Sequence, residues 1–323
     1  LKCYFEGRKE LFEGLKIMEL ETEWVKRPVI YFSMSLGGSS AQTLTEYLNN
    51  VLSSYENIYG RNPDEQSLGN RLNGIIQRAY EQAGVQIAII VDEYDAPLLH
   101  TYETGYHDAC REIYRNFFTG LKDYGYCIKC VFITGITKFT QIGMFGMLNT
   151  LVNISFSNEY ATICGFTKDE VMYYFSELLL RMADSVAVMP DELMDTMSTF
   201  YGGYHFSRGL IGVYNPFSVC YALVNLRLDS YWIASCFNEM LLKVLRKFIN
   251  EIPELDNCLI DSDFLEMSDL NMDDPKLFLY QSGSLTIEKV VGSSYMLGYP
   301  NRFLRHSQIF EQLFVLINIK EAF

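Results

Sequence analysis

A short apolar run in the first third of the chain ends abruptly in acidic residues. Residues 87–91 are all apolar, and Asp92 and Glu93 follow them directly. A strand that is apolar at every position is buried on both faces, which is typical of a parallel sheet covered by helices. Because such sheets bind ligands beyond the carboxyl ends of their strands, the pattern predicts that Asp92 and Glu93 lie at a ligand-binding edge. A buried strand that simply enters a polar turn is the alternative interpretation.

The pattern around this run predicts a layered α/β fold. Further strands are expected at residues 29–34 and 127–133, and the second of these ends at Thr134. Apolar residues recur with helical spacing in the connecting segments 41–55, 68–83 and 107–122. Strand, helices, strand, helix and strand is the order of a doubly wound α/β domain with right-handed crossovers. We therefore expect a parallel sheet with helices packed against it.

The second half of the chain predicts helices and then a hairpin. Thr167 and Glu170 are spaced as in a capping box, so a helix is expected at residues 167–182. Further helices are expected at 191–201, 215–226, 237–250, 261–270 and 307–318. Alternating segments at 284–290 and 295–299 flank a Gly-Ser-Ser turn and predict a β-hairpin. Helices followed by a hairpin indicate a winged helix.

These patterns divide the chain into three predicted parts. Residues 1–166 form an α/β core, residues 167–232 a helical segment, and residues 233–323 a winged-helix-like domain with a C-terminal helix. The chain has 323 residues, of which 49% are hydrophobic, enough for sizeable cores. The predicted protein is globular.

Charge and composition narrow the classes of function. The net charge of −14 opposes non-specific attraction to nucleic-acid phosphates. Within residues 251–290 acidic side chains greatly outnumber Lys276 and Lys289, which argues against a DNA-binding wing. No apolar stretch approaches the roughly 20 residues that span a bilayer. Scattered cysteines indicate a reducing compartment, so a cytoplasmic protein without membrane contact is expected.

Several other polar residues have two interpretations each. Asp95 either assists a metal site or caps the helix that begins at Ala96 and Pro97. His205, in a Gly-rich turn, has either a nucleotide-binding or catalytic role or a role in packing and hydrogen bonding. Cys127 and Cys130 form a C-x-x-C pair, but strand alternation would send them to opposite faces. We interpret the two cysteines as small core residues.

Seven stretches, in order along the chain, resemble one family. They are YFEG at 4–7, VDEYDAPL at 91–98, FITGITKF at 132–139, YGGYHF at 201–206, YNPFS at 214–218, QSGSLT at 281–286 and GYPNR at 298–302. With them the chain resembles the bacterial AAA-ATPase-like proteins of the P-loop superfamily, which are often joined to a C-terminal nuclease-like domain of the PD-(D/E)XK type. The resemblance implies a P-loop NTPase-like core, with ATP and Mg²⁺ as cofactors.

The same resemblance implies roles for individual residues. Asp92 corresponds to the Walker B acid that holds the metal, and Glu93 to the catalytic base. Thr134 corresponds to the polar sensor on the neighbouring strand. Lys138 and Asp95 are further candidates for the nucleotide site. The implied activity is hydrolysis of ATP.

The sequence departs from the family at the phosphate loop. No G-x-x-x-x-G-K-[ST] occurs in the 323 residues, and this loop supplies the backbone N–H groups and the lysine that hold the phosphates. We therefore expect a piece of a longer protein, inactive alone and with weak nucleotide binding, that lacks the nuclease part. A second copy or another protein is the expected partner, and nucleic acid would bind only through missing parts. The alternatives are a nucleotide-independent interaction scaffold and a winged-helix DNA-binding module.

Overall fold

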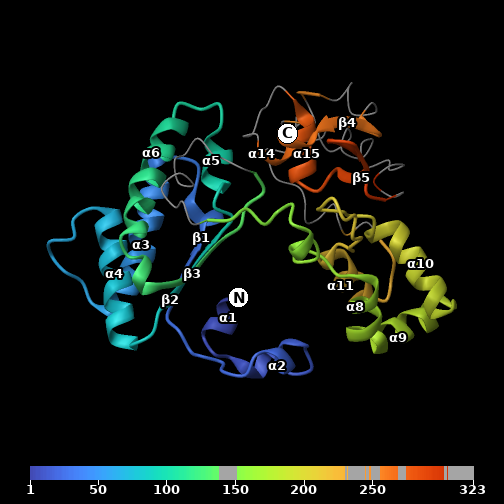
Figure 1. The fold of residues 1–323 in the computed structure, drawn as a ribbon, viewed down its shortest axis with the longest axis horizontal. Helices are drawn as coiled ribbons and strands as arrows, with labels where there is room; N and C mark the ends of the chain where they lie inside the picture. Colours follow the sequence, from blue (N-terminus) through green and yellow to red (C-terminus); the bar gives the residue numbers. More distant parts are fainter. Residues whose placement is uncertain are drawn as a thin grey trace, which may run out of the picture. The chain divides into compact units, whose positions relative to one another are not determined.

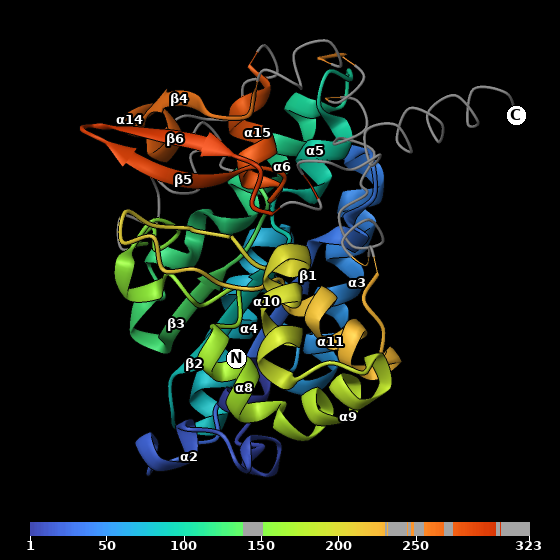
Figure 2. The ribbon, with the colours of Figure 1, turned by 90° about the vertical axis from the view of Figure 1, so that its right-hand side faces the viewer.

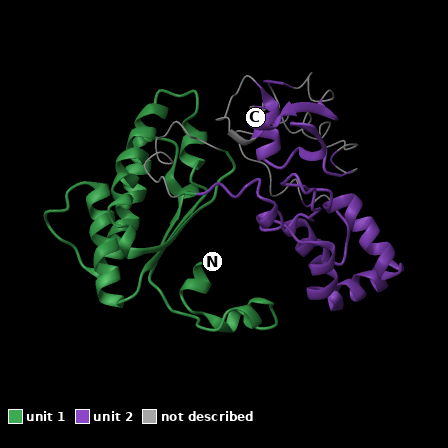
Figure 3. Ribbon diagram, in the orientation of Figure 1, with its two compact units in different colours: residues 1–151 green, residues 152–323 purple. Residues whose placement is uncertain are grey.

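The computed structural model forms two compact units, residues 1–151 and residues 152–323 (Figures 1 and 3). The structure describes residues 1–137, 151–229, 231, 244, 247–248, 255–267, 274–301 and 304. The predicted boundaries after residues 166 and 232 stay predictions. Within the described residues, no helix is both long enough and apolar enough to cross a bilayer.

The first unit contains a parallel sheet of three strands. They are β1 (Val29–Ser33), β2 (Ile87–Asp92) and β3 (Ile128–Ile133), in the order β1-β2-β3. In the register, Ser33 lies beside Asp92, and Val91 lies beside Ile133. The acidic-ended strand is therefore central among the described strands, as the buried apolar run predicts. The α/β fold and the parallel sheet are confirmed.

Three long helices pack together on one side of this sheet (Figure 1). They are α3 (Ala41–Tyr59), α4 (Leu68–Ala83) and α6 (His107–Phe118). Ser40 caps α3 in a capping box, and Gly84 ends α4 in the left-handed conformation with φ +66°. The helix expected at 107–122 ends earlier, because its last residues form a 3₁₀ turn, as is common at helix ends.

Short helices complete the first unit. The α-helices are α1 (Lys2–Phe5), α2 (Ile17–Leu20) and α5 (Ala96–Thr101). The 3₁₀ helices are η1 (Lys9–Phe12), η2 (Met34–Gly37), η3 (Thr119–Lys122) and η4 (Gly125–Cys127). The connections between the strands therefore contain helices throughout, as a parallel sheet requires.

The two faces of the sheet differ in burial. On one face Ile30, Phe32 and Ile89 are fully buried, and the Phe32 ring meets Phe117 of α6 edge-on at 5.4 Å. On the other face Phe5 of α1 packs with a cluster that includes Ala88. Because side chains alternate along a strand, Asp92 shares this second face with Ala88, and there it is only half-buried.

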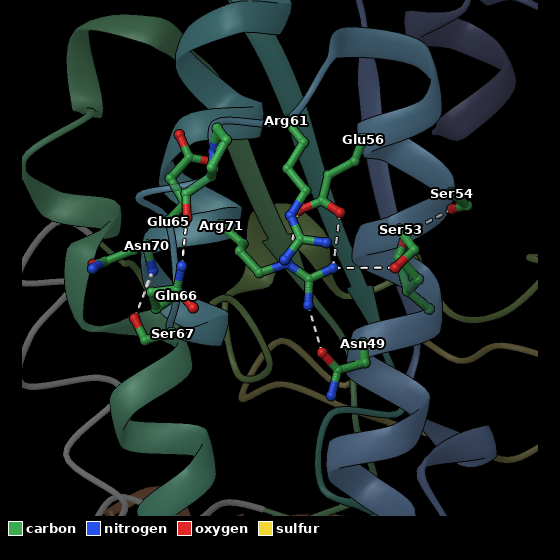
Figure 4. Close-up of polar contacts among 12 residues, drawn as sticks. Asn49, Ser53, Ser54, Glu56, Arg61, Glu65, Gln66, Ser67, Asn70 and Arg71 are labelled. Carbon is green, nitrogen blue, oxygen red and sulfur yellow. Dashed lines mark hydrogen bonds and ion pairs between the residues drawn. The ribbon is translucent and has the colours of Figure 1, made fainter.

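A buried ion pair joins α3 to α4 (Figure 4). The Arg71 guanidinium donates from Nε to Glu56 Oε1 at 2.7 Å and from Nη2 to Glu56 Oε2 at 2.9 Å. It also donates to Ser53 Oγ at 3.1 Å and to the Asn49 side-chain oxygen. These extra hydrogen bonds matter because a buried ion pair is tolerated only when its remaining donors and acceptors are satisfied.

The second unit contains four helices with a shared apolar core. They are α8 (Lys168–Tyr174), α9 (Ser176–Val186), α10 (Pro190–Tyr201) and α11 (Pro216–Asn225), preceded by η6 (Asn158–Tyr160). The capping box of Thr167 and Glu170 is confirmed. The single helix expected at 167–182 is wrong, because Phe175 leaves helical geometry between α8 and α9 and contacts Phe166 at 5.3 Å.

A small antiparallel sheet follows in the second unit (Figure 2). Its strands β4 (Cys258–Asp261), β5 (Thr286–Val291) and β6 (Ser294–Gly298) lie in the order β4-β6-β5. Helices α14 (Ser262–Met267) and α15 (Pro275–Gln281) connect β4 to β5.

The hairpin expected at 284–299 is confirmed, with Gly292 in its turn at φ +61°. Strand β4 is too short to be predicted from alternation. Nearly all residues of two predicted helices, 237–250 and 307–318, lie outside the described residues. The same holds for the end of the helix predicted at 261–270.

Candidate functional site

Two hydroxyl groups hold the carboxylate of Asp92 at the end of β2. Thr134 donates from Oγ1 to Asp92 Oδ1 at 2.5 Å, and Tyr31 donates from its hydroxyl to Asp92 Oδ2 at 3.1 Å. Tyr31 lies in β1, Asp92 is the last residue of β2, and Thr134 directly follows β3. A carboxylate whose two oxygens each accept a hydrogen bond is fixed in orientation. Each oxygen still has a lone pair for a further ligand.

The backbone around Thr134 continues the sheet beyond the last paired residues of β3. Its amide donates to the carbonyl of Val91 at 2.9 Å, and its carbonyl accepts from the amide of Tyr94 at 2.9 Å. The amide of Glu93 also approaches Thr134 Oγ1 at 3.4 Å. Thr134 is therefore held by main-chain bonds to Val91 and Tyr94, which precede and follow Asp92 and Glu93, and this places its hydroxyl against the Asp92 carboxylate.

Glu93 follows Asp92 in a left-handed backbone conformation. Its φ is +51°, and its side chain is exposed. For a residue with a Cβ this conformation costs about 1–2 kcal/mol. Such outliers persist only where the surrounding structure holds them, and they are frequent at functional sites. The turn lets the chain leave the strand while Tyr94 and Asp95 enter the core.

Tyr31 remains a hydrogen-bond donor at physiological pH. Burial raises the pKa of Tyr31, the hydrogen bond with Ser33 lowers it, and the hydrogen bond to Asp92 raises it, with a net increase. The Lys2 ammonium lies over the Tyr31 ring at 5.3 Å from the centroid. The Tyr55 hydroxyl of α3 accepts from the Tyr31 amide at 2.7 Å. Contacts from α1 and α3 therefore hold the side chain and the backbone of Tyr31.

Asp95 is buried under the turn that follows Thr134. Only 1% of its surface is exposed. Its carboxylate accepts from the Ile136 amide at 3.2 Å and from Thr137, through both the amide and the hydroxyl. Of the two interpretations, capping by the side chain is wrong: Asp95 stands at the N-cap of α5, but its carboxylate makes no cap hydrogen bond to that helix. Its role at a metal site stays a prediction.

The sequence analysis missed Tyr31 and Thr137. Alternation places Tyr31 on the strand face of Ser33, but only the register of β1 and β2 brings that face to Asp92. Nothing in the sequence pattern pairs Thr137 with Asp95, because they meet only through the parallel pairing of β2 and β3. Lys138 lies outside the described residues, and its role stays a prediction.

The histidine and the cysteine pair considered as candidates have structural contacts. His205 donates from Nδ1 to the Ile287 carbonyl at 3.0 Å, and its amide donates to Thr286 Oγ1 at 2.7 Å. Cys127 and Cys130 are free thiols. Among the described residues, no group of three or more His, Cys, Asp or Glu side chains could hold a metal ion.

A Mg²⁺ ion that is bound together with a nucleotide needs fewer than three protein ligands. Mg²⁺ commonly uses one or two carboxylates and completes its shell with water and substrate phosphates. The half-buried carboxylate of Asp92, oriented by Thr134 and Tyr31, fits this requirement. The donor set therefore agrees with a hydrated Mg²⁺ held mainly by phosphate.

Comparison with known proteins finds a family match for the first part of the chain. Residues 1–145 match the family model AAA-ATPase-like, described as predicted AAA-ATPase. Residues 1–145 belong to this family. The matched range contains the three strands together with Asp92, Glu93, Asp95 and Thr134. Membership in the AAA-ATPase-like family implies nucleotide binding in general terms.

One relative extends the similarity beyond this region. It is a protein of Azotobacter chroococcum mcd 1 described as an uncharacterized protein in the vnfD 5' region, 27% identical over 308 residues. The match covers 92% of this chain and 56% of that protein, so the chain spans about half the length of the relative. No solved structure matches the chain.

Proposed function

We propose that the protein hydrolyses ATP at the carboxyl end of its parallel sheet. The observation that carries the proposal is the Thr134 hydroxyl bound to the Asp92 carboxylate at 2.5 Å, with Glu93 next in the chain. Phosphoryl-transfer ATPases combine an acid for the metal, a base or water-positioning residue and electrostatic stabilisation at such an edge. Family membership of residues 1–145 supports a nucleotide as the ligand.

In this proposal each side chain has a separate task. Asp92 would hold a hydrated Mg²⁺, and the ion when bound neutralises charge on the phosphates. Glu93 accepts a proton from the attacking water, for which its exposed side chain is accessible. Thr134 and Tyr31 keep the Asp92 carboxylate in one orientation, so less reorganisation is needed when the charge of the bound phosphates changes.

The proposal applies to the full-length protein. A phosphate cradle of the form G-x-x-x-x-G-K-[ST] does not occur among the 323 residues. We also propose that the sheet of the first unit belongs to a P-loop core of the AAA-ATPase-like kind. The parallel order β1-β2-β3 with helical crossovers supports it. The helices and the β4-β6-β5 sheet of the second unit support a winged-helix-like domain.

Substitution of Glu93 by Gln tests the assignment. In the full-length protein we expect retained ATP binding and turnover reduced by roughly 10²- to 10⁴-fold, the range for loss of a general base. Glu103→Gln is the matched control, because Glu103 is also exposed and also has a positive φ, of +60°. Unchanged turnover in Glu93→Gln would exclude the proposed base.

A nucleotide-independent interaction scaffold is the competing function. No G-x-x-x-x-G-K-[ST] occurs among the 323 residues, and a scaffold needs no such phosphate cradle. Titration of the full-length protein with ATP and Mg²⁺ separates the two functions. Binding that requires Mg²⁺ and weakens in Asp92→Asn supports the ATPase, and the lack of binding supports the scaffold.

A further inference from the structure

A second, buried hydrogen-bond network holds the turn that begins at Thr134. We propose that Asp95 is a positioning residue for the reaction, which acts by fixing the turn of residues 134–137 and thereby the Thr134 hydroxyl. The inference rests on the proposed function for its effect on turnover. Its structural part concerns this chain alone and is tested separately.

The carboxylate of Asp95 binds the turn through both of its oxygens. Oδ1 accepts from the Ile136 amide at 3.2 Å, and Oδ2 accepts from the Thr137 hydroxyl at 2.7 Å and from the Thr137 amide. Asp95 and Thr137 are 1% and 4% exposed. A buried carboxylate is costly unless its charge is hydrogen-bonded, so this side chain is favourable here only while the turn stays in place.

The neighbouring tyrosines hold the same turn. The Tyr94 hydroxyl donates to the Thr137 carbonyl at 2.8 Å, and the Tyr94 amide donates to the Thr134 carbonyl at 2.9 Å. Tyr114 of α6 donates from its hydroxyl to the Tyr94 carbonyl at 2.5 Å. Residues 94 and 95 thus bind the first and last residues of the turn, and Tyr114 of α6 binds residue 94 in turn.

The packing of Gly135 gives independent evidence that the turn is closely held. A Cβ at this position would lie 2.5 Å from Asp95 Oδ1 and 2.5 Å from the Tyr94 ring. Side chains do not tolerate such distances, so the turn lies against Tyr94 and Asp95 only because residue 135 has none. The turn is therefore packed directly against the residues that follow β2.

The consequence concerns the Asp92 carboxylate. Thr134 is the first residue of this turn and donates to Asp92 Oδ1. If the Asp95 network loosens, the Thr134 hydroxyl loses its fixed position against Asp92, although Asp95 itself lies outside the reacting edge. A misplacement of a positioning group lowers the rate of the chemical step more than it weakens substrate binding.

Hydrogen exchange tests the structural part without any ATP. In Asp95→Asn, an amide group would face the donors of residues 136 and 137, so we expect exchange of the Thr134, Ile136 and Thr137 amides to accelerate about tenfold or more. The amides of β1 should keep their wild-type protection. Unchanged exchange at Thr134 would overturn the positioning role, whether or not the protein hydrolyses ATP.

Two milder variants test the same network if Asp95→Asn does not fold. Thr137→Val removes the hydroxyl bond to Asp95 at nearly constant volume, and Thr137→Ser retains it. Thr137→Val should accelerate exchange at Thr134, and Thr137→Ser should restore protection. Equal exchange in the two variants would contradict the network.

Turnover in the full-length protein tests the link to catalysis. We expect Thr137→Val to lower kcat roughly tenfold with the KM for ATP changed less than about twofold, and Thr137→Ser to recover most of the rate. Faster exchange with unchanged kcat would overturn the role in catalysis. A wild-type protein without turnover would contradict the proposed ATPase, and the exchange data would still decide whether Asp95 positions Thr134.

Discussion

Tyr31 of β1 donates its hydroxyl hydrogen to Asp92 of β2, with 3.1 Å between the two oxygens. The contact joins the first strand to the acid that the sequence singles out. Tyr31 pairs in register with Ile90, so its side chain reaches two residues further along β2 to meet Asp92. The proposed metal ligand is therefore oriented from both neighbouring strands, by Tyr31 on one side and Thr134 on the other.

Replacement of Tyr31 by Phe should raise the Mg²⁺ concentration needed for half-maximal ATP turnover. The variant leaves Asp92 Oδ2 without this donor, and a hydrogen bond to a charged group in a half-exposed site supports an effect of about 3- to 10-fold. Turnover against Mg²⁺ concentration measures it. Tyr59→Phe makes the same chemical change on α3. An unaltered Mg²⁺ dependence in Tyr31→Phe would show that Asp92 needs no support from β1.

Replacement of Thr134 by Val should lower kcat about tenfold or more. The change removes the donor to Asp92 Oδ1 at nearly constant volume, and hydrogen bonds to charged groups are stronger than neutral ones. Thr134→Ser keeps a hydroxyl and should recover most of the rate. Steady-state kinetics on the full-length protein separate kcat from KM. If Val and Ser gave the same rate, the hydroxyl would have no part in turnover.

Glu56→Gln should destabilise the first unit in a pH-dependent way. The hydrogen bonds from Arg71 lower the pKa of Glu56 below its ordinary value of 4.5. A lowered pKa means that the ion pair stabilises the fold above about pH 4.5, and that this contribution is lost as the pH falls through the folded-state pKa. At pH 7 the variant leaves Arg71 buried without its carboxylate, which costs about 3–5 kcal/mol.

Urea unfolding at pH 7 and at pH 3 measures this difference. The free-energy gap between wild type and Glu56→Gln should narrow at the lower pH. Glu46→Gln is the control, since Glu46 lies exposed on the same helix. An equal gap at both pH values would contradict the ionised pair.

Gly84→Ala should destabilise the end of α4 by about 1 kcal/mol. Gly84 has φ +66°, and an added Cβ would meet nothing within 4 Å, so the cost comes from backbone conformation alone. Gly105→Ala is the matched control, because its Cβ also has open space and its φ is not positive. Urea unfolding compares the two variants. Equal stability would show that α4 ends without strain in Gly84→Ala.

Tyr201→Phe should open the segment after α11 in the second unit. The Tyr201 hydroxyl accepts from the Asp229 amide at 2.9 Å and donates to the Asp229 carbonyl at 3.0 Å. Burial raises the pKa of Tyr201 to about 12. Because this pKa is raised, the stabilisation is present below pH 10 and is lost only as the pH rises through about 12.

Hydrogen exchange of the Asp229 amide is the measurement for this variant. Exchange should accelerate about fivefold or more in Tyr201→Phe. Tyr173→Phe, at a ring that is 73% exposed, should leave it unchanged. Equal protection of Asp229 in both variants would show that the hydroxyl bridge adds nothing.

The sequence by itself determined the order of strands and helices in the first unit. Local signals suffice there: the uninterrupted apolar run of β2 requires burial on both faces, and the capping residues Ser40 and Gly84 mark helix ends through bonds to their immediate neighbours. The same run placed Asp92 at the carboxyl edge. Where local signals were weak, at Phe175 and at β4, the prediction failed.

The tertiary structure alone decided the partners of the polar residues. Asp95 follows a strand and precedes Ala96 and Pro97, so local rules allowed either a helix cap or a metal-site role, yet its carboxylate binds a turn more than 40 residues away in the chain. Tyr31 looked like one apolar position of a strand until the register brought it to Asp92. Local spacing fixes which face a side chain takes, whereas strand pairing fixes what lies beside it.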